Sequence, residues 1–314
     1  MLPILESGEE TLVGGQAVME GVMMRAPHSY CVAVRKPDGT LVTEEMPLAR
    51  MSETHKIFRL PVFRGIGTLY QALKLGGRAL KFSATAALDD PSQPAANKPP
   101  KEMPAWALAA PILFSVAFFI FAYKFLPLFL VTKLSHLYPA LEGRIAFNSV
   151  DGLIRLVILL TLLAVLSMTK DIRRIFEYHG AEHKVVFNFE SGQPVNVENA
   201  QRFTTYHPRC GTSFLFVVFV LAIPVYALMP AQTFLMKLLF RILLVPLIAG
   251  VAYELIRFAA KRRGSFLATL TAPGLWMQRI TTKPPSNDQA EVAIRALDGA
   301  MALEKSQGGE LVIA

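Results

Sequence analysis

The stretch KDIRRIFEYHGAEHKVVFNFESGQPVNVENAQRFTTYHPRCGTSF, from Lys170 to Phe214, is a polar segment between two long apolar runs. It contains three of the six histidines, His179, His183 and His207, and one of the two cysteines, Cys210. Imidazole and thiol groups gathered between apolar runs of membrane-spanning character are the strongest functional indication in the sequence. We therefore interpret the remaining segments by how they would surround this one.

The composition predicts an α-helical polytopic membrane protein. Of its 314 residues 53% are hydrophobic, with a mean hydropathy of +0.39, and soluble domains are usually less apolar. Four apolar blocks are predicted as transmembrane helices, at residues 105–131, 150–168, 213–229 and 234–260. The net charge of +8 suits loops that face anionic membrane lipid. We expect no nucleic-acid partner, because no basic run is interleaved with aromatic residues.

The lysines and arginines predict how these helices are oriented. They are concentrated before the first apolar block, between the second and third, and after the fourth. By the positive-inside rule, both termini and the central loop of a multi-pass inner (plasma) membrane protein then face the cytoplasm. The two cysteines, Cys31 and Cys210, are far apart in sequence, which favours a reducing compartment over a disulfide framework.

The segment before the first apolar block predicts a small β-rich subdomain and a helix. In residues 1–50, the runs CVAVRK and LVTEEM flank a Pro-Asp-Gly turn, which is typical of a β-hairpin, and we expect two to four strands. Residues 51–104 predict a basic amphipathic helix followed by a proline-rich linker. The apolar spacing of Ile66, Leu69, Leu73 and Leu80 fits a helix in the membrane interface or one packed on the β subdomain.

The cytoplasmic motif loop, residues 169–212, contains an H-x-x-E-H spacing from His179 to His183. Residues four apart share one face of a helix, so both imidazoles can reach the same metal ion. Glu182 is then positioned to act as the general base of a metal-dependent hydrolase. The alternative is that these side chains only form hydrogen bonds at the membrane surface.

A second motif, His207-Pro-Arg-Cys210, precedes the third apolar block. Together with His179 and His183 it gives four nitrogen or sulfur ligands for a divalent metal, and zinc is the expected ion. A closed set of four is typical of a structural site, whereas three ligands and an open position are typical of a catalytic one. Cys210 could instead be a nucleophile beside His207, or a buried thiol with no chemical role.

Four further charged residues are second-tier candidates. Glu254 lies in the fourth apolar block and is a candidate third ligand, since an acid that deep in a membrane span needs a partner or a function. Glu20 lies in an apolar, glycine-flanked stretch and needs a partner if it is buried, with Arg64 as the candidate. Arg64 could instead contact lipid phosphate. Glu177 immediately precedes the metal-ligand motif.

Four runs of the sequence together resemble the bacterial DUF1385 family, also called the YqhQ-like proteins. In chain order they are GGQAVMEGVMMRAP, FRGI, EYHGAEHK and HPRCGTSF. The resemblance extends from about Val13 to the last predicted helix, in the cytoplasmic tail at residues 261–314. It implies a metal-dependent membrane protein. It provides neither a substrate nor an established set of catalytic residues.

Two hypotheses of different classes follow. In the first, the protein is a metal-dependent hydrolase that acts on a membrane-embedded or membrane-adjacent substrate. In the second, it is a non-enzymatic membrane factor that docks a partner such as the protein translocation or insertion machinery, and any metal is structural. A transporter with a histidine gate has less support, because the spans lack the paired interrupted helices of common transporter folds.

Overall fold

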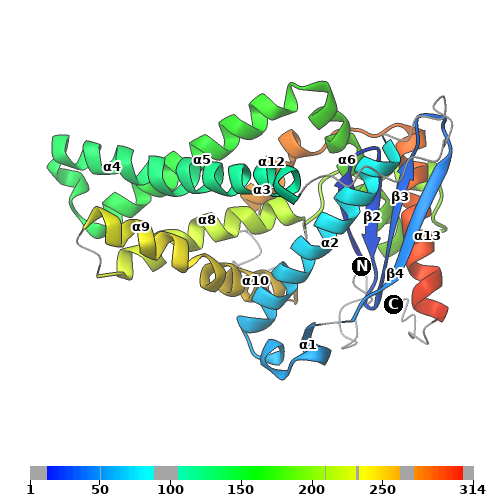
Figure 1. Ribbon diagram of the computed structural model, residues 1–314, viewed down its shortest axis with the longest axis horizontal. Helices are drawn as coiled ribbons and strands as arrows, with labels where there is room; N and C mark the ends of the chain where they lie inside the picture. Colours follow the sequence, from blue (N-terminus) through cyan, green and yellow to red (C-terminus); the bar gives the residue numbers. More distant parts are fainter. Residues whose placement is uncertain are drawn as a thin grey trace.

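The computed structural model has a layered sheet at one end and a bundle of apolar helices at the other (Figure 1). The structure describes residues 13–49, 51–87, 105–208, 210–230, 233–261 and 272–306. Most of the predicted linker therefore lies outside the described residues. The polar segment that begins with α6 (Lys170–Glu190) joins the two ends.

The predicted β-rich segment is a four-stranded antiparallel sheet in chain order, which confirms the sheet and its hairpin. Its strands are β1 (Gly14–Val18), β2 (Gly21–Arg25), β3 (Ser29–Arg35) and β4 (Leu41–Pro47). Arg35 pairs with Leu41 across the predicted turn, and Gly39 in that turn has a φ of +86°. A positive φ at this position favours glycine, which explains the Pro-Asp-Gly sequence.

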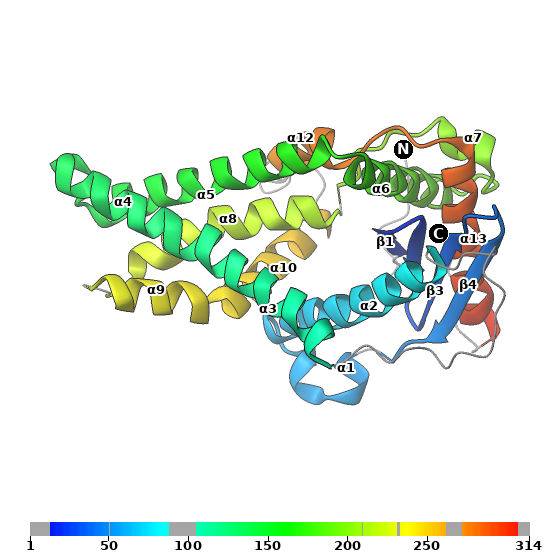
Figure 2. The ribbon, with the colours of Figure 1, turned by 45° about the horizontal axis from the view of Figure 1, so that its top comes forward.

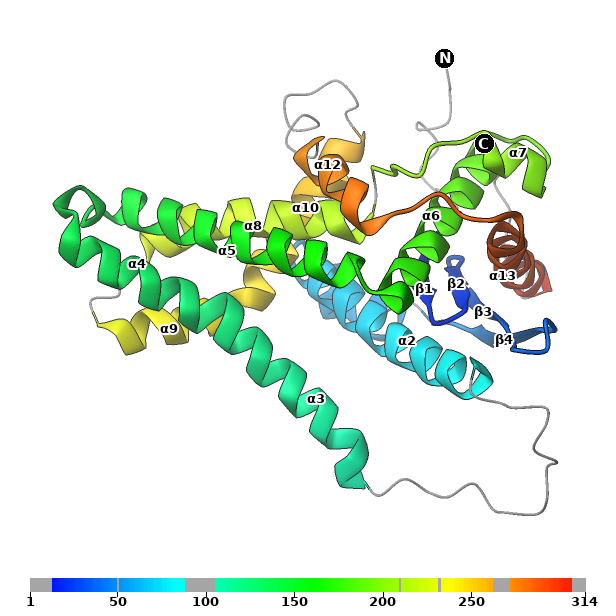
Figure 3. The same ribbon diagram turned by 90° about the horizontal axis from the view of Figure 1, so that it is seen from above.

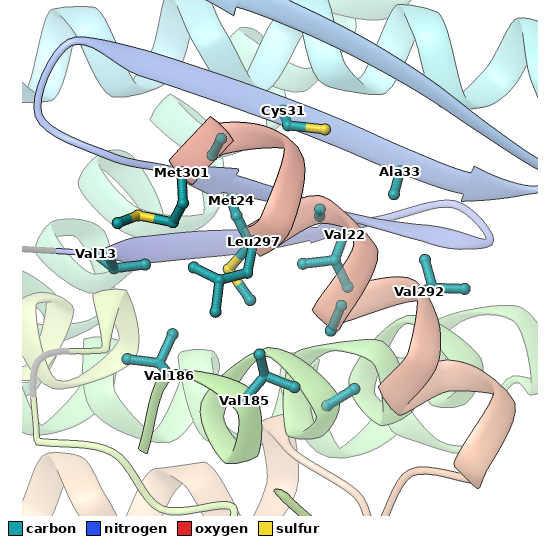
Figure 4. Packing of buried hydrophobic residues seen from close by; sticks show 14 of the residues in the cluster. Val13, Val22, Met24, Cys31, Ala33, Val185, Val186, Val292, Leu297 and Met301 are labelled. Atoms are coloured by element: carbon teal, nitrogen blue, oxygen red, sulfur yellow. The ribbon is translucent and has the colours of Figure 1, made fainter. Parts of the chain in front are cut away.

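Helices cover both faces of the sheet (Figure 2). Side chains alternate between the faces of a strand, so Val22, Met24 and Cys31 face α6 and α13 (Asn287–Ser306), as Figure 4 shows. Met23 and Val32 face α2 (Phe63–Ala87) instead. The sheet is therefore the middle layer of a unit that includes the polar segment and the C-terminal helix.

Of the two placements predicted for the basic helix, α2 takes the one against the sheet. Its packed face consists mostly of small residues, including Gly65, Gly76 and Ala79, which let neighbouring backbone approach closely. The larger Leu73 and Leu80 are exposed. The apolar spacing seen in the sequence thus marks the face that α2 does not pack.

Among the described residues, three helices are long and apolar enough to cross a membrane, and a bent pair is a fourth candidate if it counts as one span. They are Leu113–Leu137, Arg144–Ser167 (α5), Gly211–Leu228 (α8) and the pair α9 (Phe234–Leu243) with α10 (Val245–Lys261). The pair bends by 48° at Leu244, next to Pro246, whose ring cannot continue a regular helix. These helices suggest a membrane protein, whereas the predicted orientation stays a prediction.

The first of these helices contains a π-helical turn, Phe121–Phe125, between α3 (Ala105–Ile120) and α4 (Leu126–Leu137). From there α3 diverges from the bundle, as Figure 3 shows. Further short helical elements in the described part of the chain are α1 (Met51–Thr54), α7 (Val197–Gln201), α12 (Ala272–Thr281) and two 3-10 helices, Lys56–Arg59 and Pro139–Leu141.

The C-terminal segment connects the bundle to the sheet. Helix α12 packs against α8 and α5, and the extended residues after it cross α6 on their way to α13 (Figure 3). Lys283 donates its backbone N–H to the carbonyl of Phe176 at 2.9 Å. The tail therefore lies directly against the helix that carries the two histidines, which the sequence did not indicate.

Candidate metal centre

The H-x-x-E-H motif lies within one continuous helix, α6, despite its internal glycine. The four-residue spacing places His179 and His183 on the same face, with ring centroids 4.4 Å apart. The predicted convergence of the two imidazoles is therefore present in the structure.

Both imidazoles use Nδ1 in a hydrogen bond to a backbone carbonyl. His179 Nδ1 lies 2.8 Å from Thr281 O, and His183 Nδ1 lies 2.5 Å from Thr205 O. A carbonyl oxygen can only accept, so the proton of each neutral ring is at Nδ1 and the lone pair is at Nε2. This is the arrangement that outer partners impose on histidines that bind a metal through Nε2.

The thiol of Cys210 completes a group of three ligand-type atoms. Its Sγ lies 3.2 Å from His179 Nε2, and the ligand atoms of His179, His183 and Cys210 all lie within 4.8 Å of one another. A tetrahedral zinc site separates its nitrogen and sulfur ligands by roughly 3.3–3.6 Å, so small side-chain adjustments would bring these atoms to that spacing. The donor set and its geometry therefore fit a zinc ion.

Glu182 lies at the edge of this group. Its side chain is 6% exposed, and Oε2 lies 3.5 Å from His183 Nε2. Strand β1 holds it there, because a Cβ at Gly15 would lie only 2.5 Å from Glu182 Cγ. Such close approach of the β1 backbone requires glycine, so the sheet fixes the carboxylate beside the imidazoles.

His207 is next to the group without being one of its three members. Its ring packs on Phe187 with centroids 4.5 Å apart and lies 5.6 Å from the ring of His183. Its Nε2 is 3.6 Å from a carboxylate oxygen of Glu190. The predicted four-ligand set is thus brought together as three, and the cysteine lies beside His179 rather than beside His207.

The second-tier acids lie elsewhere. Glu254 is not a third ligand, because its carboxylate is paired with Arg64, whose Nε donates at 2.6 Å. Arg64 is consequently not the partner of Glu20. Glu20 instead accepts hydrogen bonds from Arg174 at 2.6 Å and from Tyr178 at 3.2 Å. These pairs tie α2 to α10 and the β1–β2 turn to α6.

Glu177 also has a structural partner. Its Oε2 accepts a hydrogen bond from Gln289 Nε2 at 3.0 Å, which connects α6 to the start of α13. Two helical turns further along, Lys184 donates to the backbone carbonyls of Gln201 and Phe203 at 2.7 and 2.6 Å. Burial lowers the pKa of Lys184, and the two carbonyls hold its ammonium group in place.

Gln278 is a positioning residue that sequence reasoning missed. Its fully buried amide accepts from the N–H of His207 at 2.8 Å and donates to the carbonyl of the same residue at 2.8 Å. It also donates to Ser213 Oγ at 3.2 Å. Gln278 therefore fixes the His207–Cys210 turn, and a glutamine inside the apolar run LWMQRI is the signal that could have identified it.

The glycine of the motif has a specific packing role. A Cβ at Gly180 would lie 2.0 Å from the carbonyl oxygen of Lys283. Only glycine lets the segment after α12 cross α6 closely enough for Thr281 to accept from His179.

The fold and the site together define a class of protein. It has apolar helices of membrane-spanning length and a histidine–cysteine group where those helices meet a sheet-containing unit. The chain belongs to the DUF1385 family, because a family profile described as "Protein of unknown function (DUF1385)" matches residues 60–303. It is 33% identical over 297 residues to "Uncharacterized protein YqhQ" of Bacillus subtilis (strain 168), and the match covers 93% of this chain and 92% of that protein. No solved structure matches.

Proposed function

We propose that this protein holds a zinc ion through His179, His183 and Cys210 and acts as a metal-dependent hydrolase at the membrane surface. The observation that carries the proposal is the matched orientation of the two imidazoles, whose Nδ1 atoms both meet backbone carbonyls. These hydrogen bonds leave Nε2 of both rings available as a ligand, and His179 Nε2 lies 3.2 Å from the thiol of Cys210. Two nitrogens and one sulfur are ligands that zinc favours.

Three protein ligands leave one coordination position, which is typical of a catalytic zinc site. A zinc ion there supplies Lewis acidity and lowers the pKa of a bound water. Glu182 is the residue that would take the proton from the attacking water, since its carboxylate is 3.5 Å from the ligand nitrogen of His183. The two carbonyl acceptors, Thr281 O and Thr205 O, would keep the imidazoles in one tautomer.

The position of the group supports a substrate at the membrane. Cys210 is the residue immediately before α8, one of the membrane-spanning candidates, so the group is one residue from an apolar helix. The distribution of basic residues predicts that this end faces the cytoplasm. A lipid or a protein segment in the bilayer would therefore lie close to the group along the chain of α8.

A docking factor with a structural metal is the second candidate function, and burial favours it. His183 is 2% exposed, Cys210 8% and Glu182 6%, so a substrate would need a local opening to reach them. In that role the metal would join α6 to the start of α8. The joined surface would hold a partner such as the protein-insertion machinery.

One set of variants tests the metal and separates the two roles. Purified protein is analysed for zinc by inductively coupled plasma mass spectrometry and labelled with a photoreactive hydroxamate, which binds metals that have an open position. Wild type should contain one zinc per chain and label. His183→Ala should lose both properties, whereas Glu182→Gln should keep zinc and label. His136→Ala, at an exposed histidine on α4, is the matched control and should match wild type.

The outcomes divide the hypotheses. Wild-type protein without zinc, or zinc that survives in both His179→Ala and His183→Ala, refutes the metal site. Zinc that is present without hydroxamate labelling supports the structural role. Alkylation gives an independent check, because zinc should protect Cys210. Cys31 should stay unlabelled at neutral pH with or without zinc, since burial raises its pKa to about 12.

A further inference from the structure

A second polar cluster lies inside the apolar bundle, between side chains of α5, α8, α9 and the π-helical turn of the first span. Its centre is Asp151, which is fully buried. Arg155 and Arg241, each 2% exposed, share this one carboxylate. Arg241 Nη1 donates to Asp151 Oδ1 at 2.5 Å, and Arg155 contacts the other carboxylate oxygen. Two guanidinium groups therefore meet a single negative charge.

A third cation adjoins this pair. Lys124, 8% exposed, is placed by the π-helical turn of the first span and donates to Tyr226 Oη at 3.3 Å. The guanidinium carbons of Arg155 and Arg241 lie 5.0 and 5.4 Å from the centroid of the same tyrosine ring. Arrangement around an aromatic ring eases the burial of cations but does not neutralise them.

The cluster is short of negative charge. Three buried cations face one buried carboxylate, and charges inside a membrane bundle are costly unless they are paired. Arg155 Nε has no hydrogen-bond partner among the residues that the structure describes. The cluster as it stands therefore has donors and positive charge that an added anion would satisfy.

A cavity of about 320 Å³ reaches this cluster. Of the cluster residues, Arg241 and Tyr226 line it, whereas Arg155 and Lys124 do not. The lining also includes Asn148, whose Oδ1 accepts from Arg241 at 3.0 Å, and Arg144, Lys237 and Glu142. Arg144 and Lys237 add two cations and Glu142 adds one carboxylate, so the excess of positive charge continues from the cluster into the cavity. The cavity is large enough for a small anion and a few attached atoms.

We propose that this cavity binds a phosphate-bearing anion, either the headgroup of an anionic phospholipid or free phosphate. Guanidinium groups present planar forks of N–H donors that match phosphate oxygens in pairs. The excess of more than one positive charge favours phosphate over a single carboxylate. This site is independent of the histidine–cysteine group, because no residue lines the cavity and also belongs to that group.

The test uses variants that spare the buried ion pairs. Lys237, half-buried with its ammonium 4.2 Å from the Phe147 ring centroid, is changed in Lys237→Gln, and the double variant adds Arg144→Gln. Lys133→Gln is the matched control, because Lys133 lies over Phe129 at 5.8 Å and does not line this cavity. Melting temperatures of all variants verify that they fold.

Two measurements distinguish the sources of phosphate. Native mass spectrometry after reconstitution in phosphatidylglycerol and phosphatidylcholine detects retained lipid, and calorimetry in detergent detects inorganic phosphate. Lys237→Gln should weaken binding of the preferred probe about tenfold, since one charge-assisted contact is lost, and Lys133→Gln should not. Binding of neither probe, or equal losses in Lys237→Gln and Lys133→Gln, would overturn the proposal.

Discussion

Replacement of Gly180 by alanine tests whether close crossing of α6 by the tail orients the candidate metal ligands. The new Cβ would lie 2.0 Å from Lys283 O, so that backbone must retreat by roughly 1 Å or more to reach ordinary contact. The shift would break the hydrogen bond of Lys283 N–H to Phe176 O and that of His179 Nδ1 to Thr281 O.

The magnitude follows from three opposing effects. Overpacking costs about 1–3 kcal/mol, and each lost hydrogen bond costs about 1 kcal/mol. Alanine in place of glycine inside a helix stabilises the folded state by about 1 kcal/mol. The net loss for Gly180→Ala is therefore about 2–4 kcal/mol, which lowers the melting temperature by roughly 4–16 °C, at about 2–4 °C per kcal/mol for a chain of this size.

Gly77→Ala is the matched control, because Gly77 also lies inside a helix and is exposed, and a Cβ added there would have nothing within 4 Å. It should be neutral or raise the melting temperature by a few degrees. Both variants are measured by differential scanning fluorimetry in one detergent, with zinc content in parallel. Gly180→Ala that melts like Gly77→Ala and retains zinc would show that the crossing does not orient His179.

Two further predictions concern residues outside the histidine–cysteine group. Gln278→Ala should cost about 2–4 kcal/mol, because it leaves the buried N–H and carbonyl of His207 without their partner, and unchanged melting would contradict this. Burial acts to raise the pKa of Glu304, but hydrogen bonds from His28 and Ser29 outweigh it and the net pKa is lowered. Its stabilising effect should thus be complete above the unfolded-state pKa of about 4.3 and lost as the pH falls through the folded pKa. In melting curves from about pH 6 to pH 3, Glu304→Gln should lose less stability than wild type.

Local sequence patterns were sufficient for features set by neighbouring residues. The hairpin at β3 and β4 follows from alternation around a turn whose glycine needs a positive φ. The shared face of His179 and His183 follows from helical geometry alone. Such features depend on contacts a few residues apart, which a sequence displays directly.

Features set by distant residues were not predictable in the same way. Whether Cys210 or His207 joins the two imidazoles depends on Gln278, 71 residues after His207 in the chain. The pairing of Arg64 with Glu254 likewise spans 190 residues, and either partner alone fits several roles. A single sequence contains no signal that links His207 to Gln278, or Arg64 to Glu254, because the two partners lie far apart in the chain.

The packed face of α2 was hidden for a different reason. Hydrophobic periodicity locates a helix face by its large apolar residues, and here these include the exposed Leu73 and Leu80. The buried face uses glycine and alanine, whose contribution is close backbone approach rather than apolar area. Gly76, for example, lies against the side chain of Gln16 in β1. Periodicity of large apolar residues therefore located the exposed face of α2 and not the face that packs.

Removal of the metal should loosen the junction between the bundle and the sheet-containing unit, a prediction that rests on the proposed zinc site. The ligands come from α6 and from the residue before α8, and their carbonyl partners are Thr205 and Thr281. A metal at a hundred times its dissociation constant stabilises the bound state by about 2.7 kcal/mol.

Chelation should therefore speed amide hydrogen exchange up to about a hundredfold in residues 205–214 and 279–285. The β3–β4 hairpin contributes no ligand and serves as the internal control, since its exchange should stay constant. Equal acceleration in the hairpin would mean that chelation unfolds the whole unit. Unchanged exchange in residues 205–214 would contradict the proposal that a metal joins Cys210 to α6.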